Sequence, residues 1–428
     1  MSATAFRSIT TRLLAGGLLL VAAAPLAAQD VDVKTMGSML MITGGDLPVE
    51  FSISTNPLTD DGDGGGSTGD AVTVTPAKGT TLNGSPDALS FADVKSLKIT
   101  LGPDIDHVHF VDFTFGGNIK LKAGLGNDTV DFTGCTLGGV EKLFGDDGDD
   151  TFTYATSTIT GKITLIGGDG NLTMDATDTN MVDTSVTGGT GDTQVTWNTV
   201  SVKGKVRLKL KQGNDTVSFT AVDIGLKTDV SLSQGDNTFT ATNCSLNDQL
   251  KLGGGNGADT VSFEDSGIGL ALKATLGSGV NSFALNSVAS AMQVGEQLIV
   301  KGGPDADTVT ITAGATPGLV VQVGEFAKVS LSGDANTFTS TGVLQVGTDL
   351  KYSGGGDDDH VSLDGVGIGE DFTATLAGGN NDVTLNDCIG TNVKITAGSG
   401  DDTVAFTGTT AFSGKQTIKL GGGDNTEP

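Results

Sequence analysis

A short motif recurs along this chain at intervals of about 22 residues. Each copy begins with a Gly-rich turn and continues with Asp or Asn, then Thr, then apolar residues at alternate positions, as in NDTVDF, NDTVSF and DDTVAF. We take the Thr as the anchor of each copy; Thr216, Thr238 and Thr260 are three successive anchors. Alternation with a period of two predicts a β-strand, because successive side chains of a strand point to opposite faces.

One such unit is too small to bury its own apolar face, but stacked units share a thin core and pair every backbone edge. We therefore predict an all-β fold, a single-stranded parallel β-helix (β-solenoid) with coils of about 22 residues, over residues 101–428. Residues 29–100 lack the regular repeat. They predict an irregular, β-rich N-terminal cap with a flexible loop near 56–70.

The first 28 residues have the composition of a targeting segment. Arg7 and Arg12 precede an apolar run from Leu13 to Ala24, and small residues follow as far as Ala28. The run is too short to span a bilayer, and the sequence has no second run of spanning length. We predict a Sec-type signal peptide over residues 1–28, no transmembrane segment, and a secreted product that is extracellular or periplasmic.

The chain is strongly acidic. It has 24 Lys and Arg against 51 Asp and Glu, a formal net charge of −27 at pH 7. This charge repels nucleic acid and anionic membranes and attracts cations. It also disfavours self-association, so we expect a monomeric rod. End-to-end association is the alternative, because the last residues, GGGDNTEP, begin a coil whose open end is a template for pairing.

The three cysteines share one position in the repeat. Cys135, Cys244 and Cys388 each lie six residues after an anchor position. The same inward phase on coils that lie about five or more apart puts them beyond the Cα separation of about 7 Å that a disulfide can bridge. We predict three free cysteines that are buried as small apolar residues.

The turns resemble the haemolysin-type calcium-binding nonapeptide, G-G-x-G-x-D-x-apolar-x. The best copy is Gly254, Gly255, Gly257, Asp259 and Val261. More broadly, the chain is similar to secreted bacterial Gly-Asp-rich repeat proteins, although it has one such turn per coil instead of tandem nonapeptides. The resemblance implies Ca²⁺ bound by turn carbonyls and carboxylates, since calcium takes six to eight oxygen ligands. The candidate metal ligands are Asp128, Asp146, Asp147, Asp149, Asp150, Asp259, Asp357, Asp358, Asp359 and Asp402.

A second interpretation of the same turns needs no metal. The residue before the anchor alternates between Asp and Asn from Asp215 to Asn425. In a stack, this alternation places a carboxylate on every second coil with an amide between, and each amide can donate to a neighbouring carboxylate. The sequence leaves both interpretations open.

The composition favours structural or binding work over catalysis. Polysaccharide lyases are the usual β-helix enzymes and depend on basic residues, but residues 29–428 contain one Arg, Arg207. We predict no enzymatic activity and a secreted binding solenoid that is associated with a cell surface or extracellular matrix, with an adhesive role toward a surface glycan or protein. A lyase-like enzyme is the first alternative. The second is an ice- or mineral-binding Thr ladder, suggested by Thr238, Thr240 and Thr242.

One stretch, KGKVRLKLK, concentrates positive charge. Its five basic residues alternate with apolar residues and face outward on one predicted strand. We expect them to pair across strands with Asp183 and Asp229. Alternatively, they form a cationic stripe that binds an acidic glycan or a neighbouring acidic rod. The five residues are Lys203, Lys205, Arg207, Lys209 and Lys211.

Overall fold

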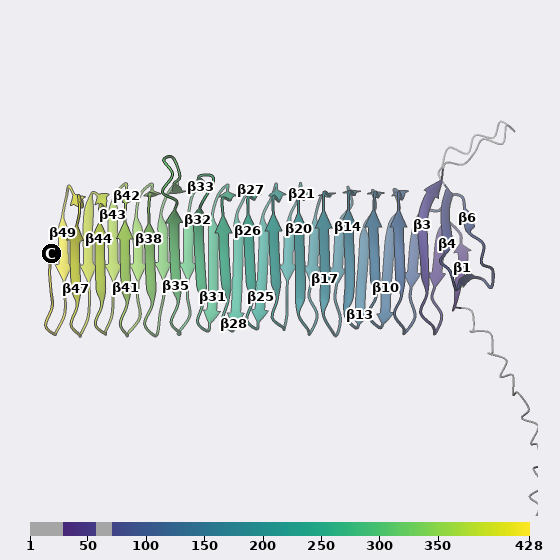
Figure 1. The fold of residues 1–428 in the computed structure, drawn as a ribbon, viewed down its shortest axis with the longest axis horizontal. Coiled ribbons are helices and arrows are strands. Elements are labelled where there is room, and N and C mark those ends of the chain that lie inside the picture. Colours follow the sequence, from purple (N-terminus) through teal and green to yellow (C-terminus); the bar gives the residue numbers. More distant parts are fainter. Residues whose placement is uncertain (1–28, 57–70) are drawn as a thin grey trace, which may run out of the picture.

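The computed structural model describes residues 29–56 and 71–428, which form one long rod of stacked strands (Figure 1). The predicted signal peptide and most of the predicted flexible loop lie outside the described residues. The described residues contain strands and no helix, so the predicted all-β class is confirmed. Accordingly, no helix in this part of the chain has the length and apolar character needed to cross a bilayer.

A coil consists of three strands and one turn. In one coil, β23 (Thr216–Thr220) leads to β24 (Asp223–Ile224) and then to β25 (Thr228–Gln234), and a Gly-Asp turn carries the chain to the next coil. Each strand pairs in parallel with its equivalent in the next coil, for example Thr216 with Thr238, 22 residues on. The predicted parallel β-helix is confirmed.

The three strands of each coil build three parallel sheets, the faces of the rod. In Figure 1 the Gly-Asp turns form its lower edge and the shortest strands its upper edge. The sheet that follows the turn, which we name the threonine face after its outward side chains, contains β8 (His107–Val111), β11 (Thr129–Thr133), β14 (Asp150–Ala155), β17 (Leu172–Thr177), β20 (Thr193–Asn198), β23, β26 (Thr238–Thr242), β29 (Thr260–Glu264), β32 (Ser282–Ser287), β35 (Thr308–Ala313), β38 (Thr337–Thr341), β41 (His360–Asp364), β44 (Asp382–Asn386) and β47 (Thr403–Thr407).

The second sheet has 14 strands and is named the short-strand face. It contains β9 (Thr114–Phe115), β12 (Thr136–Leu137), β15 (Thr158–Ile159), β18 (Asn180–Met181), β21 (Ser201–Val202), β24, β27 (Ser245–Leu246), β30 (Gly267–Ile268), β33 (Met292–Val294), β36 (Val321–Val323), β39 (Leu344–Val346), β42 (Val366–Ile368), β45 (Ile389–Gly390) and β48 (Ala411–Phe412).

The third sheet is named the lysine face, because its strands carry most of the Lys side chains. From the start of the regular coils it contains β7 (Ser96–Thr100), β10 (Asn118–Leu125), β13 (Glu141–Asp147), β16 (Ile163–Ile166), β19 (Thr184–Thr187), β22 (Val206–Lys209), β25, β28 (Leu250–Asn256), β31 (Leu272–Ser278), β34 (Leu298–Lys301), β37 (Ala327–Ser330), β40 (Leu350–Ser353), β43 (Asp371–Thr375), β46 (Asn392–Thr396) and β49 (Gln416–Lys419).

The core is a continuous column inside the three faces. Side chains alternate as the sequence predicts: in β23, Val217 and Phe219 are buried while their neighbours face outward. Aromatic rings from successive coils stack, with centroids 4.5 Å apart for Phe110 and Phe132 and 4.7 Å apart for Phe132 and Tyr154. Such stacking stabilises neighbouring coils beyond the area that it buries.

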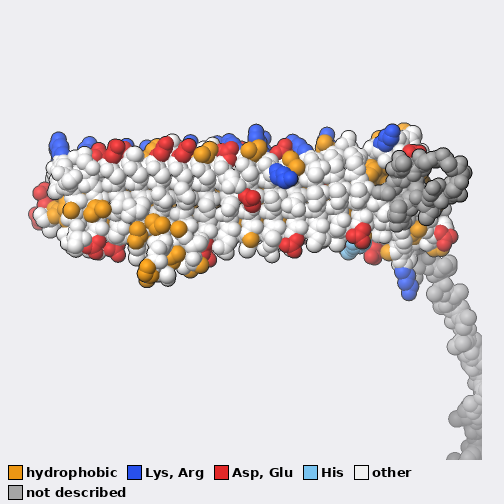
Figure 2. Space-filling view, turned by 90° about the horizontal axis from the view of Figure 1, so that it is seen from above, with side chains coloured by type: hydrophobic (Ala, Val, Ile, Leu, Met, Phe, Trp, Pro, Cys, Tyr) orange, Lys and Arg blue, Asp and Glu red, His pale blue; other side chains and the backbone are white. Residues whose placement is uncertain are grey.

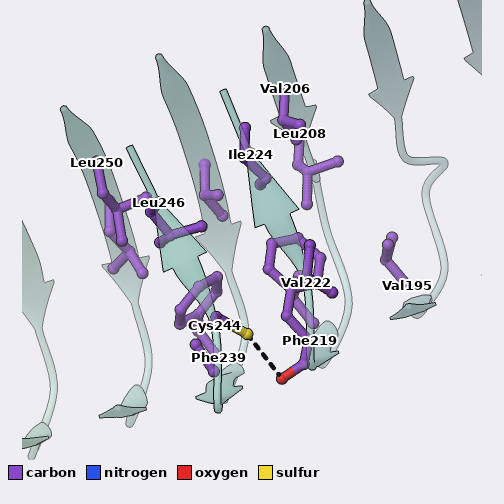
Figure 3. Close-up of a cluster of buried hydrophobic side chains, with 14 of the residues drawn as sticks. Val195, Val206, Leu208, Phe219, Val222, Ile224, Phe239, Cys244, Leu246 and Leu250 are labelled. Atoms are coloured by element: carbon purple, nitrogen blue, oxygen red, sulfur yellow. Dashed lines mark hydrogen bonds between the residues drawn. The ribbon is translucent and has the colours of Figure 1, made fainter. Parts of the chain in front are cut away.

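The three cysteines are free and buried, as the repeat predicts. They occupy a buried column at the corner between the threonine and short-strand faces, which they share with small polar residues such as Ser157 and Ser266 and with apolar residues such as Val222. The backbone N–H of Cys244 donates to Ser266 Oγ at 3.0 Å, and Cys244 Sγ donates to the carbonyl oxygen of Phe219 at 3.5 Å (Figure 3). Burial raises the pKa of the Cys135 thiol to about 11, which keeps this thiol protonated and unreactive at neutral pH.

The segment predicted as an N-terminal cap is β-rich, and it already takes part in the stack. Antiparallel hairpins join β1 to β2 and β3 to β4. However, β2 pairs in parallel with β7 and β3 with β8, so the stacking begins before the boundary predicted at residue 100. The strands of this segment are β1 (Gln29–Met36), β2 (Met39–Thr43), β3 (Glu50–Asn56), β4 (Ala71–Pro76), β5 (Thr80–Leu82) and β6 (Leu89–Phe91).

Two coils are longer than the others. Equivalent positions Asn281 and Asp307 are 26 residues apart, and Asp307 and Asn336 are 29 apart. The extra residues lie between β32 and β33 and between β35 and β36, at the same corner of the rod. Insertions at a corner leave all three sheets in register, as the drift of the repeat in the sequence suggests.

Candidate functional site

The Gly-Asp turn positions one polar residue inside the rod in each regular coil except the one in which Leu172 takes this position. At Gly257, φ is 124°, and a Cβ atom there would lie 2.2 Å from the carbonyl oxygen of Gly235 in the preceding turn, so only Gly fits. The residue before each anchor then points inward. We name these side chains the inner ladder; each is at most 2% exposed: Asp106, Asp128, Asp150, Asp215, Asn237, Asp259, Asn281, Asp307, Asn336, Asp359, Asn381 and Asp402.

The Oδ1 atom of each inner-ladder residue accepts a backbone hydrogen bond from the preceding coil. The N–H of Asp215 donates to Asn237 Oδ1 at 2.9 Å, and that of Asp259 donates to Asn281 Oδ1 at 2.9 Å. Asp and Asn present the same Oδ1 acceptor, so either residue fits this position. The backbone groups at the sharpest bend of the coil are thereby satisfied without water.

The alternation adds a second bond between side chains. Asn237 Nδ2 donates to Asp259 Oδ1 and Asn281 Nδ2 donates to Asp307 Oδ1, both at 2.8 Å. The same amides also donate to turn carbonyls of their own coil, such as that of Gly235 at 2.8 Å. A buried carboxylate is costly unless it is hydrogen bonded, and the neighbouring amide supplies that bond. The predicted amide–carboxylate ladder is confirmed.

The first part of the inner ladder does not alternate. Asp106, Asp128 and Asp150 follow one another with no amide between them. Burial, reinforced by the charge of the neighbouring carboxylates, raises the pKa values of Asp128 and Asp150 to about 7. Asp128 Oδ2 is buried and has no hydrogen-bond partner among the described residues. Near pH 7 these carboxyl groups are therefore partly protonated.

One more acid lies deeper in the same region of the core. Glu141 is 1% exposed, and its Oε2 accepts a hydrogen bond from the hydroxyl of Tyr154 at 2.9 Å. Its register partners on the lysine face are Ile119 and Ile163, so apolar residues lie above and below it. Burial raises the pKa of Glu141 to about 8.

An outer ladder runs beside the inner one and was not predicted. Here the hydrogen bonds point the opposite way: the N–H of Asp149 donates back to Asn127 Oδ1, and that of Asn171 donates to Asp149 Oδ1, both at 2.9 Å. The signal was present in the sequence as a second alternation, one residue earlier in each copy: Asn127, Asp149, Asn171, Asp192, Asn214 and Asp236.

The structure divides the ten predicted calcium ligands between the two sides of the backbone. Asp128, Asp150, Asp259, Asp359 and Asp402 are buried in the inner ladder, whereas Asp146, Asp147, Asp149, Asp357 and Asp358 lie on the outside of the turns. Within residues 29–56 and 71–428, no three His, Cys, Asp or Glu side chains are grouped so that they could hold a metal ion.

The turn oxygens that a calcium ion would require already accept hydrogen bonds from neighbouring coils. The N–H of Asp169 donates to the carbonyl oxygen of Asp146 at 2.9 Å, and that of Gly148 donates to the carbonyl oxygen of Asp169 at 2.7 Å. One open hollow at this edge is lined by Asp46, Asp146 and Asp147. Calcium binding at the turns remains a prediction, and this hollow is the place where it is best tested.

If the acidic turns bind calcium, saturating Ca²⁺ should raise the melting temperature above its value in excess chelator. Ligand at a hundredfold excess over its Kd stabilises a folded protein by about 2.7 kcal/mol. The double variant Asp146→Asn/Asp147→Asn should lose part of this shift, whereas Asp178→Asn, at the opposite edge, should retain it. Identical melting curves in calcium and in chelator would show that the turns need no ion.

The lysine face collects the positive charge of the regular coils. Seen from the short-strand edge, Lys and Arg side chains line one long border of the rod (Figure 2). Among the described strands, those of the threonine and short-strand faces contain no Lys or Arg. Basic residues within strands of the lysine face are Lys98, Lys120, Lys122, Lys142, Arg207, Lys209, Lys251, Lys273, Lys301, Lys328, Lys351, Lys394 and Lys419.

Asp183 and Asp229 lie beside the basic stretch on the adjacent coils, as predicted, and Asp229 is the register partner of Arg207. Neither carboxylate, however, forms an ion pair with any of the five basic residues. Asp183 Oδ1 instead accepts the backbone N–H of Lys205 at 2.9 Å. Asp229 pairs with Lys227 on its own chain segment, with an N–O distance of 3.0 Å. Of the five basic residues, only Arg207 and Lys209 lie within a strand, β22, because the coil turns before and after it.

The threonine face carries Thr in register over several coils, for example Thr216, Thr238 and Thr260. Acidic side chains interrupt the outward columns, among them Asp131 and Glu264. These acids lie in the columns beside the anchor column, which itself carries Thr or Ser on every coil from Thr216 to Thr337.

Comparisons with protein-family models, with curated proteins and with solved structures returned no match to this chain. What the chain does must therefore be inferred from its own surfaces.

Proposed function

We propose that this protein is a secreted, non-catalytic binding rod that attaches to an anionic polymer, such as an acidic surface glycan, through its lysine face. One observation carries the proposal: in a chain with a net charge of −27, every Lys and Arg within a strand of the regular coils lies on one of three faces. A random distribution would place basic residues on all three faces.

The spacing of the charges suits an extended polymer. Lys98, Lys120 and Lys142 are register neighbours on successive coils, as are Lys251 and Lys273. Adjacent strands are about 4.8 Å apart, so the cations recur at multiples of that distance along a straight sheet. Each exposed charge contributes little alone, but many contacts along one chain act together. The acidic remainder of the rod repels polyanions and leaves this face as the attachment surface.

The full chain should bind dextran sulfate at low salt and release it in about 0.5 M NaCl, where the Debye length falls below about 5 Å. It should not bind neutral dextran. Removing four cations should weaken binding about tenfold or more, because each loses roughly 0.5 kcal/mol of attraction. Binding is measured by a retention assay on immobilised polymer. The variant combines Lys120→Gln, Lys142→Gln, Lys273→Gln and Lys351→Gln.

A matched control lowers the net charge by the same amount on the threonine face. It combines Thr151→Glu, Thr216→Glu, Thr260→Glu and Thr337→Glu. If the lysine face is the binding surface, this control should retain most of the affinity. If both variants lose the same affinity for dextran sulfate, net charge alone governs binding. If the wild-type protein does not bind dextran sulfate at low salt, the proposal is refuted.

A further inference from the structure

One part of the lysine face is hollowed. A depression of about 360 Å³ spans β22, β25 and β28 near the middle of the rod. Four cationic side chains and one carboxylate line it: Arg207, Lys209, Lys227, Lys251 and Asp229. The remaining lining residues are Leu208, Val230, Ser231 and Gly253.

The hollow exists because small residues interrupt one outward column. Lys209, Ser231 and Gly253 are register neighbours, so two small residues follow a long one. A Cβ atom at Gly253 would meet no other atom within 4 Å, which shows that the space above it is open. The adjacent column, Arg207, Asp229 and Lys251, forms the side of the hollow.

The cations around the hollow are largely unpaired. Lys227 pairs with Asp229, but among the described residues Arg207, Lys209 and Lys251 form no ion pair with a carboxylate. Arg207 is also the only Arg in the described residues. A guanidinium group binds a carboxylate, sulfate or phosphate with two parallel hydrogen bonds, which a Lys cannot do.

We propose that this hollow is a specific subsite for one anionic group on a sugar unit, a carboxylate, sulfate or phosphate. The inference rests on the proposed function and adds to it the place where one unit of the polymer is held. Arg207 and Lys251 bind the anion from opposite sides, with Lys209 near it. Ser231 donates or accepts a hydrogen bond at the floor, and Asp229, fixed by Lys227, is available to accept one from a sugar hydroxyl.

Monosaccharides test the subsite apart from the rest of the face. The full chain at low salt is titrated by calorimetry with glucuronate, glucose 6-sulfate, glucose 6-phosphate and, as the neutral control, glucose. We expect at least one acidic sugar to bind with a Kd of about 1 mM and glucose to give no heat. The acidic sugar with the lowest Kd identifies which of the three anions the subsite prefers.

Two variants test the hollow, one by filling its space and the other by removing its cations. Gly253→Tyr fills it without removing a cation, and the open space above Gly253 accommodates the new side chain. Arg207→Gln/Lys251→Gln removes the cations and leaves the space. Each should weaken binding of the acidic sugar about tenfold. The control Lys34→Gln/Lys78→Gln removes two exposed cations of the N-terminal segment, outside the lysine face, and should leave binding within about twofold.

Undiminished binding to Gly253→Tyr, or no acidic sugar binding better than glucose, would overturn the subsite. If dextran sulfate still binds in that case, the proposed function of the whole face stands while the subsite fails. If neither the polymer nor any acidic sugar binds, both fail.

Discussion

Replacing Asn281 by Asp should lower the free energy of unfolding at pH 8 by about 3 to 5 kcal/mol. Asn281 lies in the inner ladder between two carboxylates, and its amide donates to Asp307 Oδ1 at 2.8 Å and to the carbonyl oxygen of Gly279 at 2.7 Å. The substitution removes both donors and places three buried carboxyl groups in succession. At pH 5 the new carboxyl is protonated and can donate again, so part of the loss should be recovered.

Urea unfolding followed by circular dichroism at pH 8 and pH 5 measures both effects. Asn198→Asp makes the same chemical change at an exposed position of β20 and should shift the midpoint little. A small, pH-independent shift for Asn281→Asp, equal to that of the control, would show that the buried amide has no special role.

The wild-type rod should be more stable at pH 5 than at pH 8.5. The pKa values of Asp128, Asp150 and Asp215 are raised to about 7 and that of Glu141 to about 8, in each case chiefly by burial. Between the unfolded pKa values near 4 and these folded values, the folded state holds more protons than the unfolded state. Stability therefore falls as the pH rises through about 4 to 8.

The expected difference is about 3 kcal/mol or more, since one pKa unit corresponds to about 1.4 kcal/mol. The test is to measure the free energy of unfolding between pH 5 and pH 9 in 0.5 M NaCl. The salt screens interactions between exposed charges, so that the pH dependence reports the buried groups. Stability that is constant or rises across this range would contradict the assignment of protonated carboxyl groups to the core.

The variant Asp128→Asn changes the same group of buried carboxyl groups, and we expect it to stabilise the fold. It inserts an amide between Asp106 and Asp150 and reproduces the pattern seen at Asn237, whose Nδ2 donates to the next carboxylate. In the variant, an amide Nδ2 group, which can donate, replaces the Asp128 Oδ2 atom, which has no hydrogen-bond partner among the described residues. The variant should be more stable than wild type at pH 8.5 and should lose part of the pH dependence.

The fold was predictable because the same sequence motif recurs about every 22 residues along the chain. Three kinds of residue have one role each in the coil: the anchor Thr, the apolar residues one and three positions after it, and the Gly at the turn. Their spacing therefore determines where the strands and the turn lie and how the coils stack. The Asp–Asn alternation and the phase of Cys135, Cys244 and Cys388 predicted buried contacts for the same reason: equivalent positions of successive coils are neighbours in space.

The lysine face was not predicted from the sequence, because most of its basic residues, outside KGKVRLKLK, are single and far apart along the chain. Lys98, Lys120 and Lys142 recur with the period of the coil, which signals a common face. The side of the backbone on which each acid lies was harder to predict. Asp149 and Asp150 are adjacent in sequence, yet one is exposed and the other buried, and only the geometry of the turn decides which.

The alternation of the inner ladder also limits how such a rod can change its length. From Asp215 onward the backbone repeats after one coil, but the pattern of hydrogen-bonding side chains repeats only after two. Deleting one coil after Asp215 would place it directly against Asp259, whereas deleting two would place it against Asn281 and keep every amide next to a carboxylate. Two coils are therefore the smallest complete repeat of this side-chain pattern. Chains built in this way should gain or lose coils in pairs, both in evolution and in design.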